Sequence, residues 1–394
     1  MELLHGAIRG YAWGSRSAIA RIQGRPVPSD GPEAELWLGA HPGAACMVER
    51  NGSSASLRDL VAEEPVRWLG EEVLGRFGPR LPFLLKVLAA ETPLSLQAHP
   101  DAEQARRGHA SQPDSGHRNY VDPHHKPELL VAVSPFEALC GFRDPAVSAA
   151  ALAALNLPEL DPVVAALNAG PAGLHEAVRR LLSWPEGERR ALVEAAAGAE
   201  VPAAFAPHAA LVRKLAGHFP GDPGVLVALL LNHVTLAPGE GIWMPAGNLH
   251  AYLRGCGVEI MAASDNVLRG GLTPKHVDVP ELLRVLRFEV LADPVLAPVP
   301  VAPGVVTWPV PVDDFVLYGV RLDVDVPRVR LTTAGPRVVL CLAGEISVDD
   351  GGEALALRSG QAAVGAAGVE PLRLVGAGEA YVASVGSSAG ITPH

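Results

Sequence analysis

The chain changes its residue pattern twice, at about residues 144 and 231, and this limits the folds open to it. Between these points apolar residues recur at helical spacing, for example at Leu174, Val178 and Leu181. On either side, short apolar segments such as 251–253 and 258–261 lie between Gly, Pro and polar loops, a pattern typical of β-strands. We therefore predict a helical domain inserted into a mainly β protein. Nothing in the helical block suggests chemistry, so a scaffold role is expected for it.

A length of 394 residues is too large for one ordinary hydrophobic core, so several domains are expected. The catalytic β domain is predicted to span 1–143 and 232–286, with the helical insertion at 144–231. The C-terminal β domain is predicted to span 287–394. Regularly spaced short strands with turn signals favour β-sandwich or jelly-roll units in both β domains.

A weak internal repeat supports two related β units. Two sets of residues share the same spacing: Gly239, Pro245, Gly247 and His250 in the first, and Gly360, Ala366, Gly368 and Pro371 in the second. Because a proline stands where the first unit has a histidine, the C-terminal unit is predicted to bind no metal. In a chain rich in Ala and Gly, chance is the alternative explanation for the match.

The charge balance argues against two classes of protein. Lys and Arg number 32 against 43 Asp and Glu, for a net charge of −11. Proteins that bind nucleic acids or membrane surfaces carry basic patches, so neither partner is expected. The densest apolar run, 225–231, is too short to span a bilayer, and no signal peptide is expected. Four scattered cysteines without a C-x-x-C pair favour a reduced, cytoplasmic protein, which we expect to be a monomer.

Lysine is rare in this chain. Only four of the 32 basic residues are lysine, and Lys86, Lys126 and Lys275 lie in the segments richest in candidate site residues. Clustering by chance is one explanation. The other is that these positions need a compact ammonium group whose pKa can be lowered by burial and by neighbouring cations, which an arginine cannot supply. On that hypothesis the three lysines form a positive patch in an acidic chain, and one of them is neutral enough to move protons.

Residue types that bind metals collect on predicted strands. Side chains alternate along a strand, so Ser95, Gln97 and His99 share one polar face. His250 and Tyr252 share a face of a later strand in the same way. A strand with one apolar face and one polar face is typical of a β-barrel wall whose inner face carries metal ligands.

Four side chains are the predicted metal ligands: Gln97, His99, Glu128 and His250. Two imidazoles, one carboxylate and one amide oxygen suit zinc with a position left open for substrate. The loop residues His124 and His125 compete with the carboxylate as ligands. Without a metal, the amide would bond to the backbone and the first imidazole would cap the turn that follows it.

Six motifs between residues 11 and 275 make the chain resemble the type I mannose-6-phosphate isomerase (phosphomannose isomerase) family, which are zinc enzymes of the cupin superfamily. They are Tyr11-Ala-Trp-Gly-Ser15, Glu35-Leu-Trp-Leu-Gly-Ala-His-Pro42, Gln97-Ala-His-Pro100, His125-Lys-Pro-Glu128, Pro245-Ala-Gly-Asn-Leu-His-Ala-Tyr252 and Glu259-Ile-Met-Ala-Ala-Ser-Asp-Asn-Val-Leu-Arg-Gly-Gly-Leu-Thr-Pro-Lys275. The resemblance implies two cupin-type jelly-roll β-barrels with an inserted α-helical domain.

The resemblance also implies a function. The four ligands would hold one zinc ion per chain, Arg269 would be the active-site arginine, and the substrates would be mannose 6-phosphate and fructose 6-phosphate. Two residues depart from the family pattern: His124 stands where asparagine is common, and Gly270 where alanine commonly follows the arginine. Neither is a predicted ligand or a charged catalytic residue, so neither argues against activity.

An aldose–ketose isomerase moves a proton between adjacent carbons through a cis-enediol, which requires a Lewis acid, a base and a phosphate anchor. The catalytic candidates are Arg269, Lys126, Glu259, Lys86 and Asp265. Lys126, Glu259 and Lys86 compete for the role of base. Arg269 is the first choice for contact with an enediolate or a phosphate, the alternative being an ion pair with Asp265.

The predicted substrate-binding residues are Lys275, Trp13, Ser95 and Tyr252. Lys275 belongs to the positive patch, and Trp13 would stack on the sugar, although an aromatic residue beside a turn is more often part of a core.

Two other function classes fit the sequence less well. A non-catalytic cupin that binds sugar phosphates would be favoured by loss of a ligand, of Arg269 or of Lys275, and none of them is lost. A cupin-type iron oxygenase would more often use histidine-rich ligation without a dense cationic patch.

Overall fold

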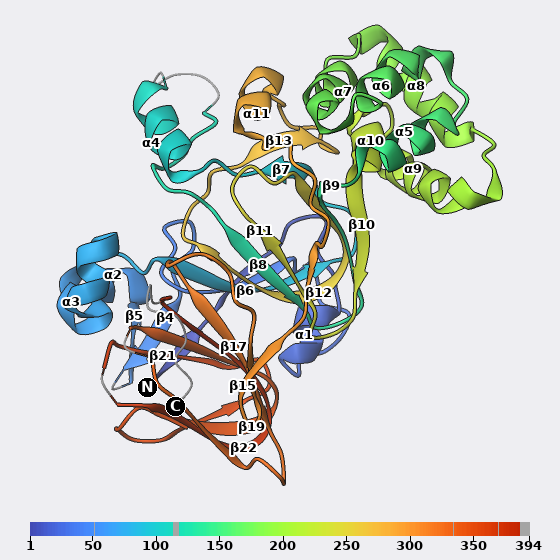
Figure 1. Ribbon diagram of the computed structural model, residues 1–394. Coiled ribbons are helices and arrows are strands. Elements are labelled where there is room, and N and C mark those ends of the chain that lie inside the picture. The colour runs from blue at the N-terminus through green and yellow to red at the C-terminus, as the bar shows by residue number, and fades with distance from the viewer. Residues whose placement is uncertain (51, 113–117, 334, 369, 387–394) are drawn as a thin grey trace.

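A computed structural model of the chain describes residues 1–50, 52–112, 118–333, 335–368 and 370–386. The fold of these residues is mainly β with several helices (Figure 1). The strands of this part of the chain pair antiparallel in two sheets of eleven strands each, which we call the site sheet and the C-terminal sheet.

The site sheet contains β2 (Ala7–Arg9), β3 (Glu35–Leu38), β6 (Phe83–Ala90), β7 (Leu96–Ala98), β8 (Glu128–Ala132), β9 (Phe136–Phe142), β10 (Leu231–Leu236), β11 (Gly241–Met244), β12 (His250–Ala262), β13 (Leu268–Gly271) and β14 (Val295–Leu296). The C-terminal sheet contains β1 (Glu2–His5), β4 (Met47–Arg50), β5 (Ser53–Ser56), β15 (Val299–Ala302), β16 (Val305–Thr307), β17 (Val316–Leu322), β18 (Arg328–Leu331), β19 (Arg337–Asp349), β20 (Leu355–Arg358), β21 (Ala362–Gly365) and β22 (Leu372–Ser384). The α-helices are α1 (Ala18–Ile22), α2 (Leu57–Glu63), α3 (Pro65–Phe77), α4 (Ala102–Ser111), α5 (Pro145–Ala153), α6 (Asp161–Leu167), α7 (Leu174–Leu182), α8 (Glu186–Gly198), α9 (Ala206–His218), α10 (Gly224–Val227) and α11 (Val279–Val285).

The C-terminal sheet includes strands from the start of the chain. β1 pairs with β21, with Leu3 opposite Ala363, and β4 and β5 follow on its other side. The first residues therefore fold against the last strands, a pairing between remote segments that no local pattern in the sequence predicts.

Because side chains alternate along each strand, one face of the site sheet packs against the apolar core and the other lines a cavity. On β6, Leu85 and Val87 enter the apolar core between the two sheets, whereas Lys86 lies on the opposite face and lines a cavity. On β12, Ile260 enters the same core, and Glu259 lies opposite Lys86 in the register of the two strands. The period of two thus separates a core face from a polar face.

β12 is one continuous strand where the sequence predicts two, at 251–253 and 258–261. The intervening Gly255 has a φ of +131°, and a Cβ there would lie 2.7 Å from Phe136 Cδ2. Only glycine can occupy position 255, because any side chain there would clash with Phe136 and would disfavour the positive φ. Beyond it, β12 changes its partners from β7 and β9 to β6 and β8, so one strand supplies residues to two parts of the site.

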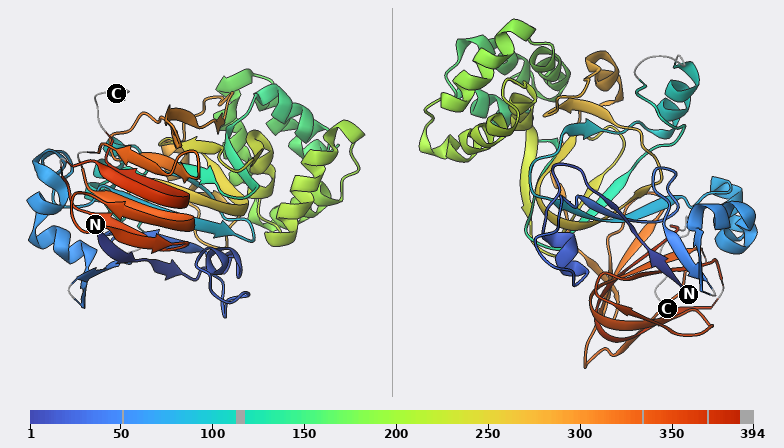
Figure 2. Two further views of the ribbon diagram at one scale, coloured as in Figure 1. Left: turned by 90° about the horizontal axis from the view of Figure 1, so that it is seen from below. Right: turned by 180° about the vertical axis from the view of Figure 1, so that it is seen from behind.

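The helices α5 to α10 occupy the predicted helical block, and they project from one end of the site sheet (Figure 2). Their core includes Leu181 and Val212 and is shared with Leu96 of β7 and with Leu249, which precedes β12. Helices thus lie between the two β regions, and the division of the chain into domains stays a prediction.

None of the helices in the described ranges combines the length and the apolar character needed to cross a bilayer. All four cysteines are buried free thiols.

Candidate metal centre and its cavity

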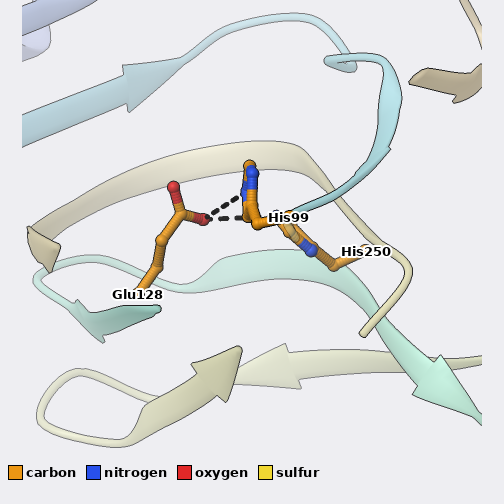
Figure 3. A group of neighbouring side chains, drawn as sticks. All are labelled: His99, Glu128 and His250. Carbon is orange, nitrogen blue, oxygen red and sulfur yellow. Dashed lines mark ion pairs between the residues drawn. The ribbon is translucent and has the colours of Figure 1, made fainter. Parts of the chain in front are cut away.

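Three side chains from separate parts of the chain meet at the polar face of the site sheet (Figure 3). His99 follows β7, Glu128 is the first residue of β8, and His250 is the first residue of β12. Their exposed fractions are 1%, 2% and 0%, respectively. The Nε2 atoms of both histidines lie 3.3 Å from Oε2 of Glu128. Among the described residues, this is the one group of three or more His, Cys, Asp or Glu side chains arranged to hold a metal ion.

Hydrogen bonds to the backbone orient both imidazoles. Nδ1 of His99 lies 2.7 Å from the carbonyl oxygen of Asn266, and Nδ1 of His250 lies 3.0 Å from that of Asn248. A carbonyl only accepts, so each Nδ1 carries the proton and each Nε2 presents its lone pair to the cluster. Burial lowers the pKa of His99 to about 4, which keeps this ring neutral near pH 7. A neutral imidazole is the form that binds metals.

The three facing atoms fit a divalent ion. Nε2 of His99, Oε2 of Glu128 and Nε2 of His250 are buried, and none makes a hydrogen bond within the described residues. Leaving buried polar atoms unpaired costs free energy, so such atoms need an explanation. Two imidazole nitrogens and one carboxylate oxygen are the protein ligands of many catalytic zinc sites, in which a further position stays open.

Glu128 is held as a carboxylate. Burial alone would raise its pKa, but the Lys126 ammonium 3.1 Å away and the neighbouring His99 hold the pKa of Glu128 well below its usual range. The competing loop histidines lie outside the cluster. His125 Nε2 instead lies 2.9 Å from a carboxylate oxygen of Asp314, a residue that precedes β17.

Gln97 lies on β7, where its register partners are His250 of β12 and Arg269 of β13. It lines the same cavity as Glu128. Its role as a fourth ligand stays a prediction.

The cluster opens onto a cavity of about 680 Å³. The residues predicted for the site that line it are Trp13, Lys86, Ser95, Gln97, Lys126, Glu128, Tyr252, Glu259, Asp265, Arg269 and Lys275. The two remaining predicted residues, His99 and His250, lie beside Glu128 at the cluster described above. The structure thus brings together side chains from the first third of the chain and from the segment after the helical insertion.

Lys86 is enclosed by acidic groups. Its Nζ lies 3.1 Å from Oε2 of Glu259 and 3.4 Å from Oε1 of Glu35. The hydroxyl of Tyr252 donates to Oε1 of Glu259 at 2.6 Å, and Nε1 of Trp37 donates to Oε2 of Glu35 at 2.8 Å. These five buried side chains form one connected network in the wall of the cavity.

The network corrects one expectation from the sequence. Crowding among cations was expected to lower lysine pKa values, but the pKa of Lys86 is raised, because Glu35 and Glu259 outweigh the opposing effect of burial. Lys86 is therefore an ammonium at neutral pH. Burial raises the pKa of Glu259 despite the nearby Lys86.

Arg269 does not pair with Asp265, the alternative suggested by their spacing. Arg269 lies on β13 rather than on a helix, and no ion pair between the two occurs among the described residues. Oδ1 of Asp265 lies 3.5 Å from Nε2 of the buried His41 instead. Both Arg269 and Asp265 line the cavity.

Sequence reasoning missed several residues of the site. Glu35 begins one of the motifs quoted above, as a carboxylate directly before the apolar segment Leu-Trp-Leu, but no site role was predicted for it. His218 and Phe219 line the cavity from the end of α9, although the helical block was expected to carry no chemistry. Asp122 accepts hydrogen bonds from Ser264 Oγ and from the backbone of Asp265, so it supports the loop that orients His99.

The fold and this cavity define a β-sheet enzyme with a candidate metal centre, and comparison with known proteins gives its family. Residues 1–145 match the family described as phosphomannose isomerase type I, catalytic domain. The chain is 36% identical to mannose-6-phosphate isomerase of Escherichia coli strain K12 over 401 residues, covering 96% of this chain and 98% of that protein. It is 37% identical to the human mannose-6-phosphate isomerase over 313 residues, covering 72% of each chain.

Solved structures of similar proteins support the same family. A histidine-to-alanine mutant of phosphomannose isomerase from Salmonella typhimurium superposes with a TM-score of 0.89 at 34% identity, covering 98% of this chain and 100% of that one. A mannose 6-phosphate isomerase bound with zinc and yttrium superposes with a TM-score of 0.87 at 34% identity and the same coverage. The chain belongs to the type I phosphomannose isomerase family and is an enzyme of the isomerase class.

Proposed function

We propose that the chain is a zinc-dependent aldose–ketose isomerase that interconverts mannose 6-phosphate and fructose 6-phosphate through a cis-enediol. The observation that carries the proposal is the buried group of His99, Glu128 and His250 with its three unpaired atoms, whose member Glu128 lines a cavity together with several cations. The family relationship extends over 96% of the chain, and a relative of known structure binds zinc. The proposal includes two cupin-type jelly-roll domains, the second without metal, and a cytoplasmic monomer.

One zinc ion per chain would be held by Gln97, His99, Glu128 and His250. When bound, such an ion supplies Lewis-acid polarisation of a carbonyl and stabilises negative charge on oxygen. The amide of Gln97 adds a neutral ligand, so Glu128 is the one anionic ligand in the proposed set.

The cations of the cavity suit a phosphorylated substrate. Arg269, Lys275 and Lys126 line the cavity in a chain whose net charge is −11. The guanidinium of Arg269 can bind two oxygens of a phosphate or an enediolate at once. Tyr11 and Trp13 stack at the cavity wall with ring centroids 5.7 Å apart, which offers an apolar surface to a sugar ring.

Moving a proton from C2 of the aldose to C1 requires a base and an acid. Glu259 and Lys126 are the candidate bases, since both line the cavity and Glu259 has a raised pKa, nearer the working range of a base. Lys86 is excluded as the resting base because its pKa is raised. It serves instead as a charged donor that orients Glu259.

The first test is a coupled assay for fructose 6-phosphate formed from mannose 6-phosphate, before chelation, after it, and after zinc is added back. We expect activity to fall to background on complete metal removal and to return with zinc, because the proposed ligands then regain their ion. Unphosphorylated mannose serves as the control substrate, with its product fructose measured directly, and should react poorly. Full activity without metal would contradict the zinc mechanism, and inactivity of the zinc-loaded protein on mannose 6-phosphate would favour a non-catalytic binder.

A second prediction concerns Arg269→Ala. We expect kcat to fall by about 10²–10³, the typical effect of removing one donor to a developing oxyanion, with zinc content unchanged. Arg254→Ala is the matched control, since Arg254 lies exposed on the same sheet near Glu91 and does not line this cavity. Loss of bound zinc in the Arg269 variant would mean that its role is structural.

A further inference from the structure

A segment of unusual backbone brings Lys275 to the cavity. Leu272 has a φ of +53°, a conformation that few residues other than glycine adopt, and the preceding Gly271 has a φ of +118°. Leu272, Thr273 and Lys275 all line the cavity. A non-glycine residue in the left-handed region is strained, so neighbouring structure must hold it in place.

The helical insertion fixes this strained segment through Asp222, a residue in the turn between α9 and α10. Oδ1 of Asp222 accepts a hydrogen bond from the backbone N–H of Gly224 at 2.7 Å. Oδ2 accepts one from the backbone N–H of Thr273 at 3.0 Å. One carboxylate therefore joins the insertion to the loop that carries Lys275.

The two backbones approach each other closely at this point. A Cβ on Gly224 would lie 2.8 Å from the backbone nitrogen of Leu272, and one on Gly271 would lie 2.8 Å from Cα of Gly224. No side chain fits between the two segments. His218 and Phe219, just before the turn, line the cavity as well. The insertion therefore reaches the site in three ways: through the backbone of Gly224, through the carboxylate of Asp222, and through His218 and Phe219 in the cavity lining.

We propose that Asp222 is a positioning residue: by bridging Gly224 and Thr273 it fixes the loop 271–275, so that Lys275 is presented to the phosphate of the substrate. The role of Lys275 rests on the proposed function. The helical insertion is then a working part of substrate binding and not only a support for the fold.

Asp222→Asn tests the bridge with little change in shape. An asparagine offers one oxygen acceptor instead of two, so its NH₂ group faces one of the two N–H donors. We expect KM for mannose 6-phosphate to rise about tenfold, kcat to change less than about threefold, and zinc content to stay the same. Hydrogen exchange of the amides in 271–275 should become faster.

Asp144→Asn is the matched control. Asp144 also lies in the helical insertion, where it accepts a hydrogen bond from the Ala146 N–H at 2.8 Å, and it does not line this cavity. A second variant, Gly224→Ala, places a Cβ against the loop and should raise KM in the same direction. In a Lys275→Ala background, Asp222→Asn should cost less than in the native chain, because both changes remove the same interaction.

The possible results distinguish a failure of the proposed function from a failure of the positioning role of Asp222. An inactive native enzyme would overturn the proposed function, while hydrogen exchange would still report whether Asp222 holds the loop. An active native enzyme with unchanged KM and unchanged exchange in Asp222→Asn would overturn the positioning role. Loss of zinc, or effects of Asp222→Asn and Lys275→Ala that simply add, would also overturn it.

Discussion

A His250→Ala variant is expected to lose at least about a hundredfold in zinc affinity and to retain only background isomerase activity. Removing an outer-shell partner of a metal typically costs 10–100-fold, and loss of a direct ligand should cost more. The remaining proposed ligands, Gln97, His99 and Glu128, would include only one imidazole, and an amide oxygen is a poor replacement for the lost nitrogen donor. Zinc content after dialysis, a competition titration with a chelator, and the coupled assay would measure the effect.

His233→Ala is the matched control for this change. His233 lies on β10 of the same sheet, and its Nε2 lies 2.8 Å from Oε1 of Glu137, outside the cavity. We expect native zinc affinity and native kcat in this variant. Tight stoichiometric zinc in His250→Ala would contradict the proposed ligand set, whereas losses in both variants would indicate a general defect in folding.

A Lys86→Met variant is expected to be destabilised by about 3–5 kcal/mol, the usual cost of removing one partner from a buried ion pair. Lys86 has an exposed fraction of 5%, and its ammonium faces both Glu35 and Glu259. Methionine fills similar volume, so the loss comes from two buried carboxylates that no longer have a cation between them. Denaturant unfolding of the zinc-loaded protein, followed by circular dichroism, would measure it.

The loss should depend on pH. Without Lys86, the folded-state pKa of Glu259 should lie further above the unfolded value of about 4.3, because burial raises it and the nearby cation is gone. A carboxyl group whose folded pKa is raised contributes stability below the unfolded pKa and loses it as the pH rises through the folded pKa. Lys86→Met should therefore be closer to native stability at pH 5 than at pH 8.

Lys214→Met is the control, because Lys214 pairs with Glu137 at a partly exposed site. A partly exposed pair contributes at most about 1 kcal/mol. In addition, Glu259→Gln should recover part of the stability lost in Lys86→Met by removing one of the unpaired charges. Equal destabilisation by Lys86→Met and Lys214→Met would show that the acidic pocket around Lys86 has no special role in stability.

Much of the site could be predicted because its chemistry follows local patterns. Alternation along 94–99 and 250–253 separates Gln97, His99 and His250 from the apolar residues beside them, and this period is visible in the sequence. The helical block between 144 and 231 was visible for the same reason, since each period reflects the geometry of one segment. A local pattern does not show which strands become neighbours, so the pairing of β1 with β21 was not predicted.

The sequence by itself determined which residues could bind a metal and a phosphate, and on which face of a strand or in which helical segment they lie. Tertiary structure decided which charges meet and how far water is excluded. Lys86 lies 51 and 173 positions from its two carboxylate partners, so its raised pKa depends on distances that no spacing in the chain encodes. The bridge from Asp222 to Thr273 has the same origin, because a contact between remote backbones exists only once both segments are folded.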